Sequence, residues 1–521
     1  MLRLILQDFL VCFLSYLLYL RLGPKPNGLQ LPPGPPAEPL LGHIRVIPQE
    51  NAERAYFRWS KEYVSDLIHV RVLGQPIIVL NSVESAIELL EKRGAIHSDR
   101  PFFAYFDMLG WHENVLVTSC NHPSFPHLRA HYQSYFAREA NRKFSQIQTN
   151  EAHKLVKRIV EQLATWKELF RAFAVAVIIQ INTGHEIKML DDTYLDIANE
   201  VGKTLTGGGP PGATGVDILP LLRYLPSWCD PTGSTAFVRK LRNSVKEMYT
   251  VPYDRVTQDI RIGSAQPSFM LSLMQEMEAQ DEGERTLSRE RIEGLCATAY
   301  AAGGDTTFHT LTTFVFAIVN YPDVQERAKA ELNAVVGPDR LPELDDRRDL
   351  PYIERLVQEV FRFWPSVPLG VPHKSTNDDI YNGMFIPKGS LLIFNVFAMT
   401  HDEAVYKDSW RFDPDRYLPH EKGGRGEPLP TGNFGFGRRI CPGQFVGDAS
   451  VFIAIATMLH VLTFEKAKDE AGREITIDPE TAKYTTGITR RVKVVHPETV
   501  LCNIRPTNER GQKLAMGSYI D

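Results

Sequence analysis

The sequence predicts a mainly α-helical protein with a small β subdomain, built as a single large domain behind an N-terminal membrane anchor. Three observations favour this fold class. The chain opens with an apolar segment, a proline-rich stretch follows, and the remainder shows mostly helical spacing of apolar residues with short strand-like pieces. Its 521 residues are 43% hydrophobic, which supplies a large core and excludes a disordered or fibrous chain.

Charge and cysteine content exclude two further classes. The 58 Lys and Arg nearly balance 63 Asp and Glu, for a net charge of −5, so no nucleic-acid partner is expected. The six cysteines are thinly spread without a CxxC pair, which argues against a disulfide-stapled secreted scaffold. The sequence also lacks an Asn-x-Ser/Thr sequon, consistent with a catalytic region outside a glycosylating lumen.

Residues 1–21 are predicted to form a transmembrane signal anchor. The uninterrupted apolar run is Phe9–Leu20, which is short beside the about 20 residues that a full span needs. A cleaved signal peptide or a buried core helix is the alternative, but neither a basic start nor a small-residue cleavage site is clear. Arg21 and Lys25 follow the run while only Arg3 precedes it, so we expect a single-pass protein with its bulk in the cytosol.

Residues 22–43 are predicted to be a proline-rich hinge, because five prolines between Leu31 and His43 prevent helix formation. Residues 44–521 then form one domain, since the rest of the sequence contains no comparable linker and no internal repeat. The glycine run GGGPPG at 207–212 follows no strand and contains two prolines, which indicates a loop rather than a dinucleotide-binding motif.

Within this domain, local patterns predict several elements. Asp66–Val72 and Pro76–Leu80 alternate around Gly74-Gln75 and predict a β-hairpin. Val83–Lys92 has helical spacing, and from about residue 141 the chain is mostly helical. Arg291–Asn320 is so apolar that we expect a helix buried nearly all round. Short strands are expected near residues 380–387 and 391–395.

The segment Phe434–Gly443, FGFGRRICPG, places Cys441 in a glycine-rich loop before a predicted helix that runs from Pro442 to His460. Proline suits the first helical position. A thiolate at Cys441 would face free backbone N–H groups and the positive end of the helix dipole. Gly435 and Gly437 permit a tight turn against a flat ligand, and Arg439 can meet an anionic group at its edge. We therefore expect a ligand at Cys441 rather than an inert buried thiol.

FGFGRRICPG resembles the FxxGxRxCxG loop of the haem-thiolate monooxygenases, the cytochrome P-450 family. The resemblance implies that Cys441 is the axial ligand of a haem (heme) iron. It also implies that Phe434, Gly437 and Arg439 belong to the cofactor-binding loop, and that His373 and Arg129 bind haem propionates. Phe125–Arg129 departs from the family's WRxxR helix, because Arg129 is kept while the aromatic N–H donor is replaced by Phe.

Two more motifs agree in order and spacing. Glu359 and Arg362 look like the family's ExxR pair, and Arg416 would complete a structural triad that fixes the haem-side core. Ala302–Thr307, AGGDTT, resembles the oxygen-activation motif, which implies that the catalytic residues Asp305 and Thr306 relay protons. Its two glycines would thin the helix beside the haem to admit dioxygen; alternatively they form a helix-packing notch.

The resemblance is closest to fungal secondary-metabolism members and covers essentially the whole chain. It implies a monooxygenase that takes NADPH-derived electrons from a separate flavoprotein reductase, in the endoplasmic reticulum membrane with the catalytic domain facing the cytosol. The substrate would be an apolar, terpenoid-like small molecule. Substrate-facing candidates carried over from the family are Phe102, Phe103, Tyr105, Phe106, Trp111, Tyr300, Ala301, Val367–Val371 and Thr485–Ile488.

Three other functions remain open from the sequence. A haem-thiolate isomerase or peroxygenase would need no reductase, although the Asp305-Thr306 pair argues against it. A non-catalytic haem carrier or sensor would show no substrate-induced spin-state shift. A helical membrane scaffold in which Cys441 is an incidental core residue would bind no haem at all.

Overall fold

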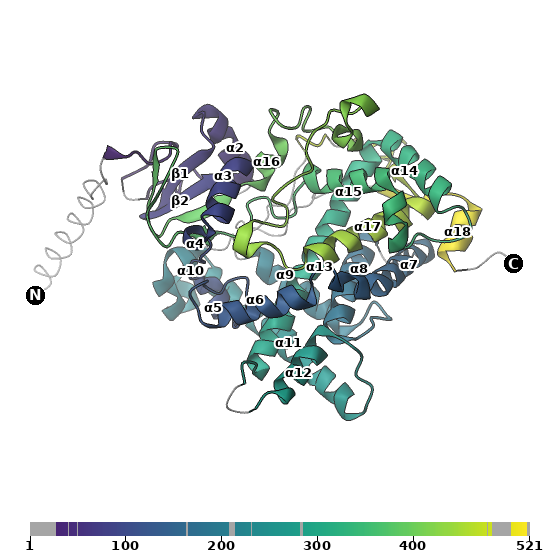
Figure 1. The fold of residues 1–521 in the computed structure, drawn as a ribbon, viewed down its shortest axis with the longest axis horizontal. Helices are drawn as coiled ribbons and strands as arrows, with labels where there is room; N and C mark the ends of the chain where they lie inside the picture. Colours follow the sequence, from purple (N-terminus) through teal and green to yellow (C-terminus); the bar gives the residue numbers. More distant parts are fainter. Residues whose placement is uncertain are drawn as a thin grey trace, which may run out of the picture. The chain divides into compact units, whose positions relative to one another are not determined.

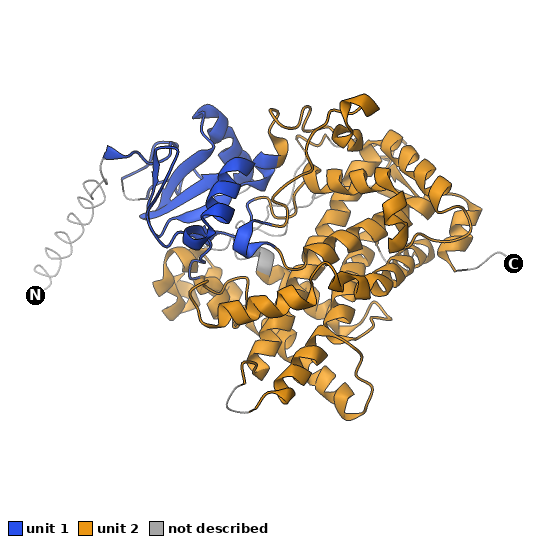
Figure 2. Cartoon of the chain, viewed as in Figure 1, with its two compact units in different colours: residues 1–102, 369–399, 435–440 blue, residues 103–368, 400–434, 441–521 orange. Residues whose placement is uncertain are grey.

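The computed structural model describes residues 28–39, 41–48, 51–162, 165–207, 214–230, 232–281, 285–476, 478–481 and 502–517 (Figure 1). The predicted anchor at residues 1–21 lies outside this part of the chain, as do the first six hinge residues and the substrate-facing candidates Thr485–Ile488. The protein divides into two compact units (Figure 2). Unit 1 comprises residues 1–102, 369–399 and 435–440, and unit 2 comprises residues 103–368, 400–434 and 441–521.

Unit 1 is built on a four-stranded sheet in the order β1-β2-β6-β3. The predicted hairpin is confirmed: β1 (Leu67–Val72) pairs antiparallel with β2 (Gln75–Leu80), and Val72 faces Gln75 across a two-residue turn. Leu73 and Gly74 both have positive φ in that turn, as the right-handed twist of a tight hairpin favours. β6 (Leu391–Phe394) pairs parallel with β2, and β3 (His373–Lys374) pairs antiparallel with β6.

The rest of unit 1 consists of short elements around this sheet. A second hairpin joins β4 (Asp379–Tyr381) to β5 (Met384–Ile386) through Asn382-Gly383, where both residues have positive φ. The helix expected at Val83–Lys92 is α3 (Val83–Ala86) continued by a π-helical turn, η2 (Ile87–Lys92). The remaining helices are α2 (Ala52–Glu62), α4 (Gly94–His97) and η9 (Gly437–Arg439), and α16 (Val396–His401) crosses the boundary between the two sets of residues.

Unit 2 is mainly helical, which confirms the predicted class. Its helices are α5 (Ala104–Leu109), α6 (Ser124–Tyr135), η3 (Ala140–Phe144), α7 (Ser145–Glu161), α8 (Trp166–Thr183), α9 (Thr193–Gly207), α10 (Gly215–Ile218), η4 (Pro220–Tyr224), η5 (Ser227–Cys229), α11 (Ser234–Arg261), α12 (Phe269–Ala279), α13 (Arg289–Asn320), α14 (Pro322–Val335), η6 (Leu344–Asp349), α15 (Pro351–Phe363), η7 (Pro414–Tyr417), η8 (His420–Lys422), α17 (Gln444–Val461) and α18 (Glu509–Ala515). One small sheet pairs β7 (Leu462–Lys466) with β8 (Cys502–Pro506).

Helix α13 is the 32-residue core helix that the apolar run predicts, and most of its side chains are buried. It packs along α8, which begins at a capping box in which Thr165 and Glu168 satisfy each other's backbone N–H groups. Gly184 ends α8 with a positive φ.

Helix α17 starts two residues later than the sequence predicts. Gly443 is its N-cap, so Pro442 lies in the turn ahead of the helix and not at its first position. Among the described residues, α17 alone is long and apolar enough to cross a membrane, and 78% of its apolar window is buried inside the fold. Its composition is therefore that of a core helix.

Candidate functional site

One face of α13 is open in the middle of an otherwise buried helix. Ala302 is exposed, while Ala299, Gly303 and Thr306 are half-buried. These positions recur at intervals of three and four residues, so they share one side of the helix. The Thr306 Oγ1 donates a hydrogen bond to the Ala302 carbonyl at 2.8 Å. The open stripe thus carries small side chains and one hydroxyl group.

The two glycines of the AGGDTT motif lie against α8. A Cβ atom at Gly303 would stand 2.8 Å from the Cγ1 of Ile178, and one at Gly304 would stand 3.2 Å from the Cγ2 of Val175. A side chain at Gly303 would require the Ile178 side chain to move, and one at Gly304 would press against Val175. The glycine pair therefore serves the close approach of the two helices, which is the packing notch left open by the sequence.

Asp305 lies in the packed region between helices. Its Oδ1 is 2.7 Å from the Nη1 of Arg171 on α8, and the carboxyl is almost fully buried. Burial raises the pKa of Asp305 above its usual value, and the Arg171 guanidinium limits the rise. Arg171 also stacks over the Phe308 ring at 4.4 Å. Asp305 and Thr306 are adjacent in sequence, yet their side chains bond to different partners.

Sequence reasoning missed Arg171. It is the one cationic side chain in the apolar stretch Leu169–Thr183 of α8. A buried arginine in an apolar helix needs an acidic partner. Its position in the sequence therefore indicated a buried ion pair, although not which acid forms it.

Cys441 stands in the turn before α17 and belongs to no disulfide. Its backbone N–H donates to the Phe434 carbonyl at 2.7 Å. This hydrogen bond closes the loop that runs from Phe434 to Cys441. Desolvation raises the pKa of the thiol, whereas the Gly443 N–H and the Arg129 guanidinium oppose that rise. Both groups favour a thiolate, and thiolate is the form that binds a metal. The donor set around Cys441 therefore fits an axial haem ligand.

Arg129 lies on α6 and is buried. Burial lowers its pKa, while Cys441, Tyr132 and Cys120 raise it. Phe125, one turn earlier, is also buried and supplies no N–H donor where the family carries tryptophan. Arg129 is therefore a cation near Cys441 that could bind a carboxylate.

The Glu359 carboxylate joins Arg362 and Arg416 in a buried cluster. Arg362 donates through Nε and Nη2 at 2.8 Å each, and Arg416 donates through Nε at 3.0 Å. Tyr417 Oη and the Asp413 backbone N–H donate to the same carboxylate at 2.7 and 2.9 Å. Burial favours the neutral acid, but the two guanidinium groups hold the pKa of Glu359 below its usual value. The charged cluster therefore ties α15 to the segment that contains η7.

Unit 1 contains one imidazole, that of His373, and two guanidinium groups that interact with it, those of Arg439 and Arg100. His373 is buried, and its Nδ1 donates to the His97 carbonyl at 2.9 Å. Burial, Arg100 and Arg439 lower the pKa of His373 well below its usual value, so the imidazole is neutral. The Arg439 Nε donates to the Ser98 carbonyl at 2.9 Å, and the Arg100 Nη1 donates to two carbonyls at 2.6 Å. The two guanidinium groups suit carboxylates, whereas the neutral His373 ring would have to gain a proton at Nε2 before it could donate to one. Arg100 was not singled out from the sequence, which carries no motif around it.

Gly437 has a φ of 54°, and a Cβ there would lie 2.2 Å from the Leu90 carbonyl oxygen within unit 1. Only glycine fits this close backbone approach. The aromatic residues proposed as substrate-facing lie in one core cluster of unit 2, which contains Phe103, Tyr105, Phe106, Trp111 and Tyr300. These five side chains are buried, whereas Phe102 of unit 1 is 62% exposed, and a substrate-facing role for them stays a prediction.

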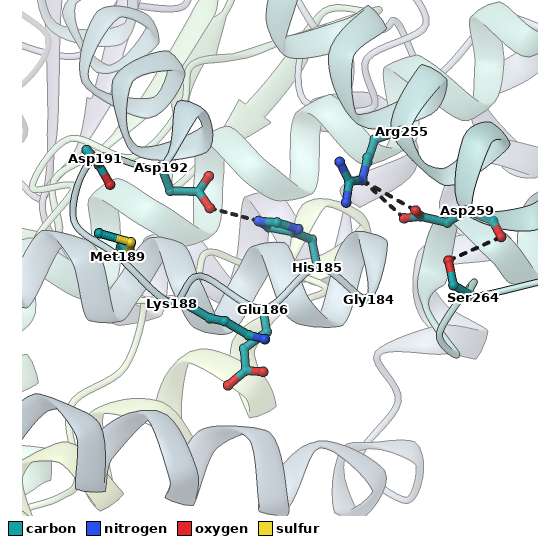
Figure 3. Close-up of a pocket in the computed structure, with 10 residues that line it drawn as sticks. All are labelled: Gly184, His185, Glu186, Lys188, Met189, Asp191, Asp192, Arg255, Asp259 and Ser264. Carbon is teal, nitrogen blue, oxygen red and sulfur yellow. Dashed lines mark hydrogen bonds and ion pairs between the residues drawn. The ribbon is translucent and has the colours of Figure 1, made fainter. Parts of the chain in front are cut away.

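A pocket of about 510 Å³ opens at the end of α8 (Figure 3). Figure 3 shows the His185 ring paired with Asp192, and Arg255 paired with Asp259 on α11. The nitrogen–oxygen distances of these two pairs are 2.8 and 3.4 Å. The other lining residues are Gly184, Glu186, Lys188, Met189, Asp191 and Ser264. The predicted catalytic and haem-binding residues are not among those that line it. Across the described ranges, no group of three or more His, Cys, Asp or Glu residues could hold a metal ion.

Comparison with known proteins places these features in context. The family model for cytochrome P450 matches residues 32–488. Cytochrome P450 monooxygenase 176 of Postia placenta is 33% identical over 93% of this chain and 92% of its own length. A cytochrome P450 monooxygenase of Armillaria gallica is 32% identical over 94% of both chains. The cytochrome P450 monooxygenase COX2 of Coprinopsis cinerea is 32% identical over 87% of this chain and 86% of its own.

Proposed function

Because the chain belongs to the cytochrome P450 family of monooxygenases, we propose that it uses dioxygen and reductase-supplied electrons to oxidise an apolar small molecule. The substrate class we propose is a terpenoid-like secondary metabolite. The observation that carries the proposal is the Cys441 thiol, which sits in a loop closed on the Phe434 carbonyl and faces the Gly443 N–H and Arg129. Burial raises the pKa of the thiol overall, and these two groups act in the opposite direction, toward the thiolate that would ligate haem iron.

Individual residues take the following proposed roles. Bound haem supplies the redox chemistry that activates dioxygen. Arg129 in unit 2, and Arg439 and His373 in unit 1, bind its carboxylates, and Phe434 and Gly437 shape the loop that receives it. Thr306 presents a hydroxyl on the open face of α13 and moves protons there. Asp305, whose carboxylate is paired with Arg171, takes up protons and passes them on toward Thr306.

We also propose the domain plan of an anchor at 1–21, a hinge at 22–43 and a catalytic domain at 44–521. In this plan a single-pass anchor holds the enzyme on the endoplasmic reticulum with the catalytic domain in the cytosol, beside an NADPH-dependent flavoprotein reductase. One described surface supports membrane contact. The segment 219–228 exposes Leu221, Tyr224 and Trp228 by 77, 71 and 86%, and such an apolar patch marks a protein or membrane contact.

Absorption spectroscopy of the reduced, carbon-monoxide-bound protein tests the core of this proposal. We expect a strongly red-shifted Soret band that disappears in Cys441→Ser. A histidine-type band in the wild type would show that Cys441 is not the ligand, and a protein without any haem band would contradict the enzyme assignment. Dependence of turnover on NADPH and reductase then separates a monooxygenase from an isomerase or peroxygenase.

A further inference from the structure

The buried cluster around Glu359 contains a second carboxylate that the three-residue motif leaves out. The Glu427 Oε2 lies 2.5 Å from the Nη1 of Arg416, and its side chain is 6% exposed. Arg416, Arg362 and Glu359 are fully buried. Two carboxylates therefore face two guanidinium groups, whereas the triad alone would hold one uncompensated positive charge.

Charge balance matters here because the cluster is shielded from water. An isolated buried charge costs several kcal/mol of desolvation unless a partner offsets it. Arg416 donates one hydrogen bond from Nε to Glu359 and another from Nη1 to Glu427. The Glu427 backbone N–H also donates to the Arg416 carbonyl at 3.0 Å, and its Oε1 accepts from the Lys407 N–H at 3.1 Å. Glu427 is therefore held through its backbone and through both carboxylate oxygens, and Oε1 also lies 3.8 Å from the Nη1 of the partly exposed Arg425.

The position of Glu427 in the chain connects this cluster to the cysteine loop. Phe434, whose carbonyl accepts the Cys441 N–H at 2.7 Å, lies seven positions further along the chain. The Phe434 ring packs edge-on against Phe361 of α15 at 5.5 Å, and Phe361 lies between Glu359 and Arg362 on that helix. The segment 427–434 is thus held at its start by Arg416 and at its end by α15.

We propose that Glu427 is a positioning residue for Cys441: it neutralises Arg416 and anchors the segment that delivers Phe434, and through Phe434 the thiol, to the haem. This inference rests on the proposed haem-thiolate function. It extends the family's triad to a four-residue, charge-balanced network in this chain.

The test compares Glu427→Gln with Glu427→Asp and with Glu421→Gln, an exposed control six residues earlier. The absorption spectrum of each full-length protein is recorded after reduction and saturation with carbon monoxide. Its thermal unfolding midpoint is measured separately. We expect Glu427→Gln to lower, several-fold, the share of haem that shows the red-shifted thiolate band, and also to lower the midpoint. Glu427→Asp keeps the charge and should restore part of both. Glu421→Gln should match the wild type.

An unchanged thiolate share in Glu427→Gln would overturn the proposal, even if the unfolding midpoint falls, because a merely structural role predicts that combination. If Glu427→Gln does not fold, Glu427→Asp decides: a share below the wild type supports the proposal and an equal share overturns it. Absence of the band from the wild type would contradict the proposed function itself, and it is seen before any variant is compared.

Discussion

Asp305 on α13 and Arg171 on α8 form a hydrogen-bonded ion pair, with Oδ1 and Nη1 2.7 Å apart. The neighbouring Thr306 hydroxyl instead donates to the Ala302 carbonyl of its own helix. The carboxyl and hydroxyl that the sequence places side by side therefore bond to different partners. A proton passes between them only when Asp305 leaves Arg171 or when water bridges the two side chains.

Arg171→Gln removes the group that limits the pKa of Asp305, so we expect the carboxyl to hold its proton at higher pH. The acid limb of the kcat–pH profile should move upward, and kcat near neutral pH should fall by about tenfold. Asp305→Asn should lower kcat by about 100-fold. Because asparagine does not titrate, the acid limb should also disappear from the profile of this variant. Lys157→Gln on the exposed face of α7 is the control. A wild-type profile in Arg171→Gln would remove Asp305 from the proton path.

His373 leads to a prediction about haem binding. Its Nδ1–H donates to the His97 carbonyl, so the neutral ring presents an unprotonated Nε2. An anionic propionate needs a donor there, and binding must therefore draw a proton onto a ring whose pKa is lowered by burial, Arg100 and Arg439. We expect haem affinity to fall, by up to about tenfold per pH unit, as the pH rises from the lowered pKa of the free ring toward neutrality.

Haem titration of the apoprotein over this pH range measures the effect. His373→Gln should flatten the pH dependence, while the exposed His420→Gln should leave it unchanged. His97, whose carbonyl accepts from His373, is itself paired with Asp379, with Nε2 and Oδ2 2.8 Å apart. His97→Gln therefore checks that the signal does not come from that pair. A pH dependence that survives in His373→Gln would place the propionate elsewhere.

The sequence predicted elements whose signal is local. The β1–β2 hairpin followed from alternation around a two-residue turn, and α13 from a continuous apolar run. The start of α17 was placed two residues too early, because Pro442 suits a turn as well as a first helical position. Local patterns thus located elements better than their ends.

Partners across the fold could not be predicted in the same way. The Glu359–Arg362 pair could be predicted because residues three positions apart lie on the same face of a helix. Arg171 and Glu427 lie 134 and 11 positions from their partners Asp305 and Arg416, and only tertiary packing brings each pair together. The glycines of AGGDTT illustrate the same limit, since their spacing does not reveal whether a haem or α8 occupies the space beside them.

Glu53 on α2 is a buried carboxyl in unit 1 that burial drives to a pKa of about 7, from a usual value of 4.5. The folded state favours the protonated form, so folding stability is full below pH 4.5 and falls as the pH rises to about 7. Glu53→Gln removes this penalty. We expect it to raise the free energy of unfolding at pH 8 by up to about 3 kcal/mol and to change it little at pH 4.

Denaturant unfolding at the two pH values checks this prediction. Glu62→Gln, on the exposed side of the same helix, is the matched control and should show no such difference. Equal stabilisation by Glu53→Gln at both pH values would mean that the gain comes from packing and not from ionisation.

The exposed apolar segment 219–228 leads to a prediction about membranes. Trp228 and Leu221 stand 86 and 77% exposed, and Arg239 donates to Ser227 and Leu225 beside them at 2.7 and 2.9 Å. Apolar side chains with a nearby cation suit the interface of an anionic bilayer.

Brominated lipid in phosphatidylserine-containing vesicles should therefore quench the tryptophan emission of the full-length protein, and Trp228→Phe should remove most of that quenching. Leu221→Ser should lower the affinity for the vesicles, measured by titrating this quenching, by about tenfold, because one large apolar side chain contributes about 1.5 kcal/mol. Leu429→Ser, an exposed leucine outside the segment, controls for lost apolar area. Quenching that persists in Trp228→Phe would assign membrane contact to other tryptophans and leave segment 219–228 in water.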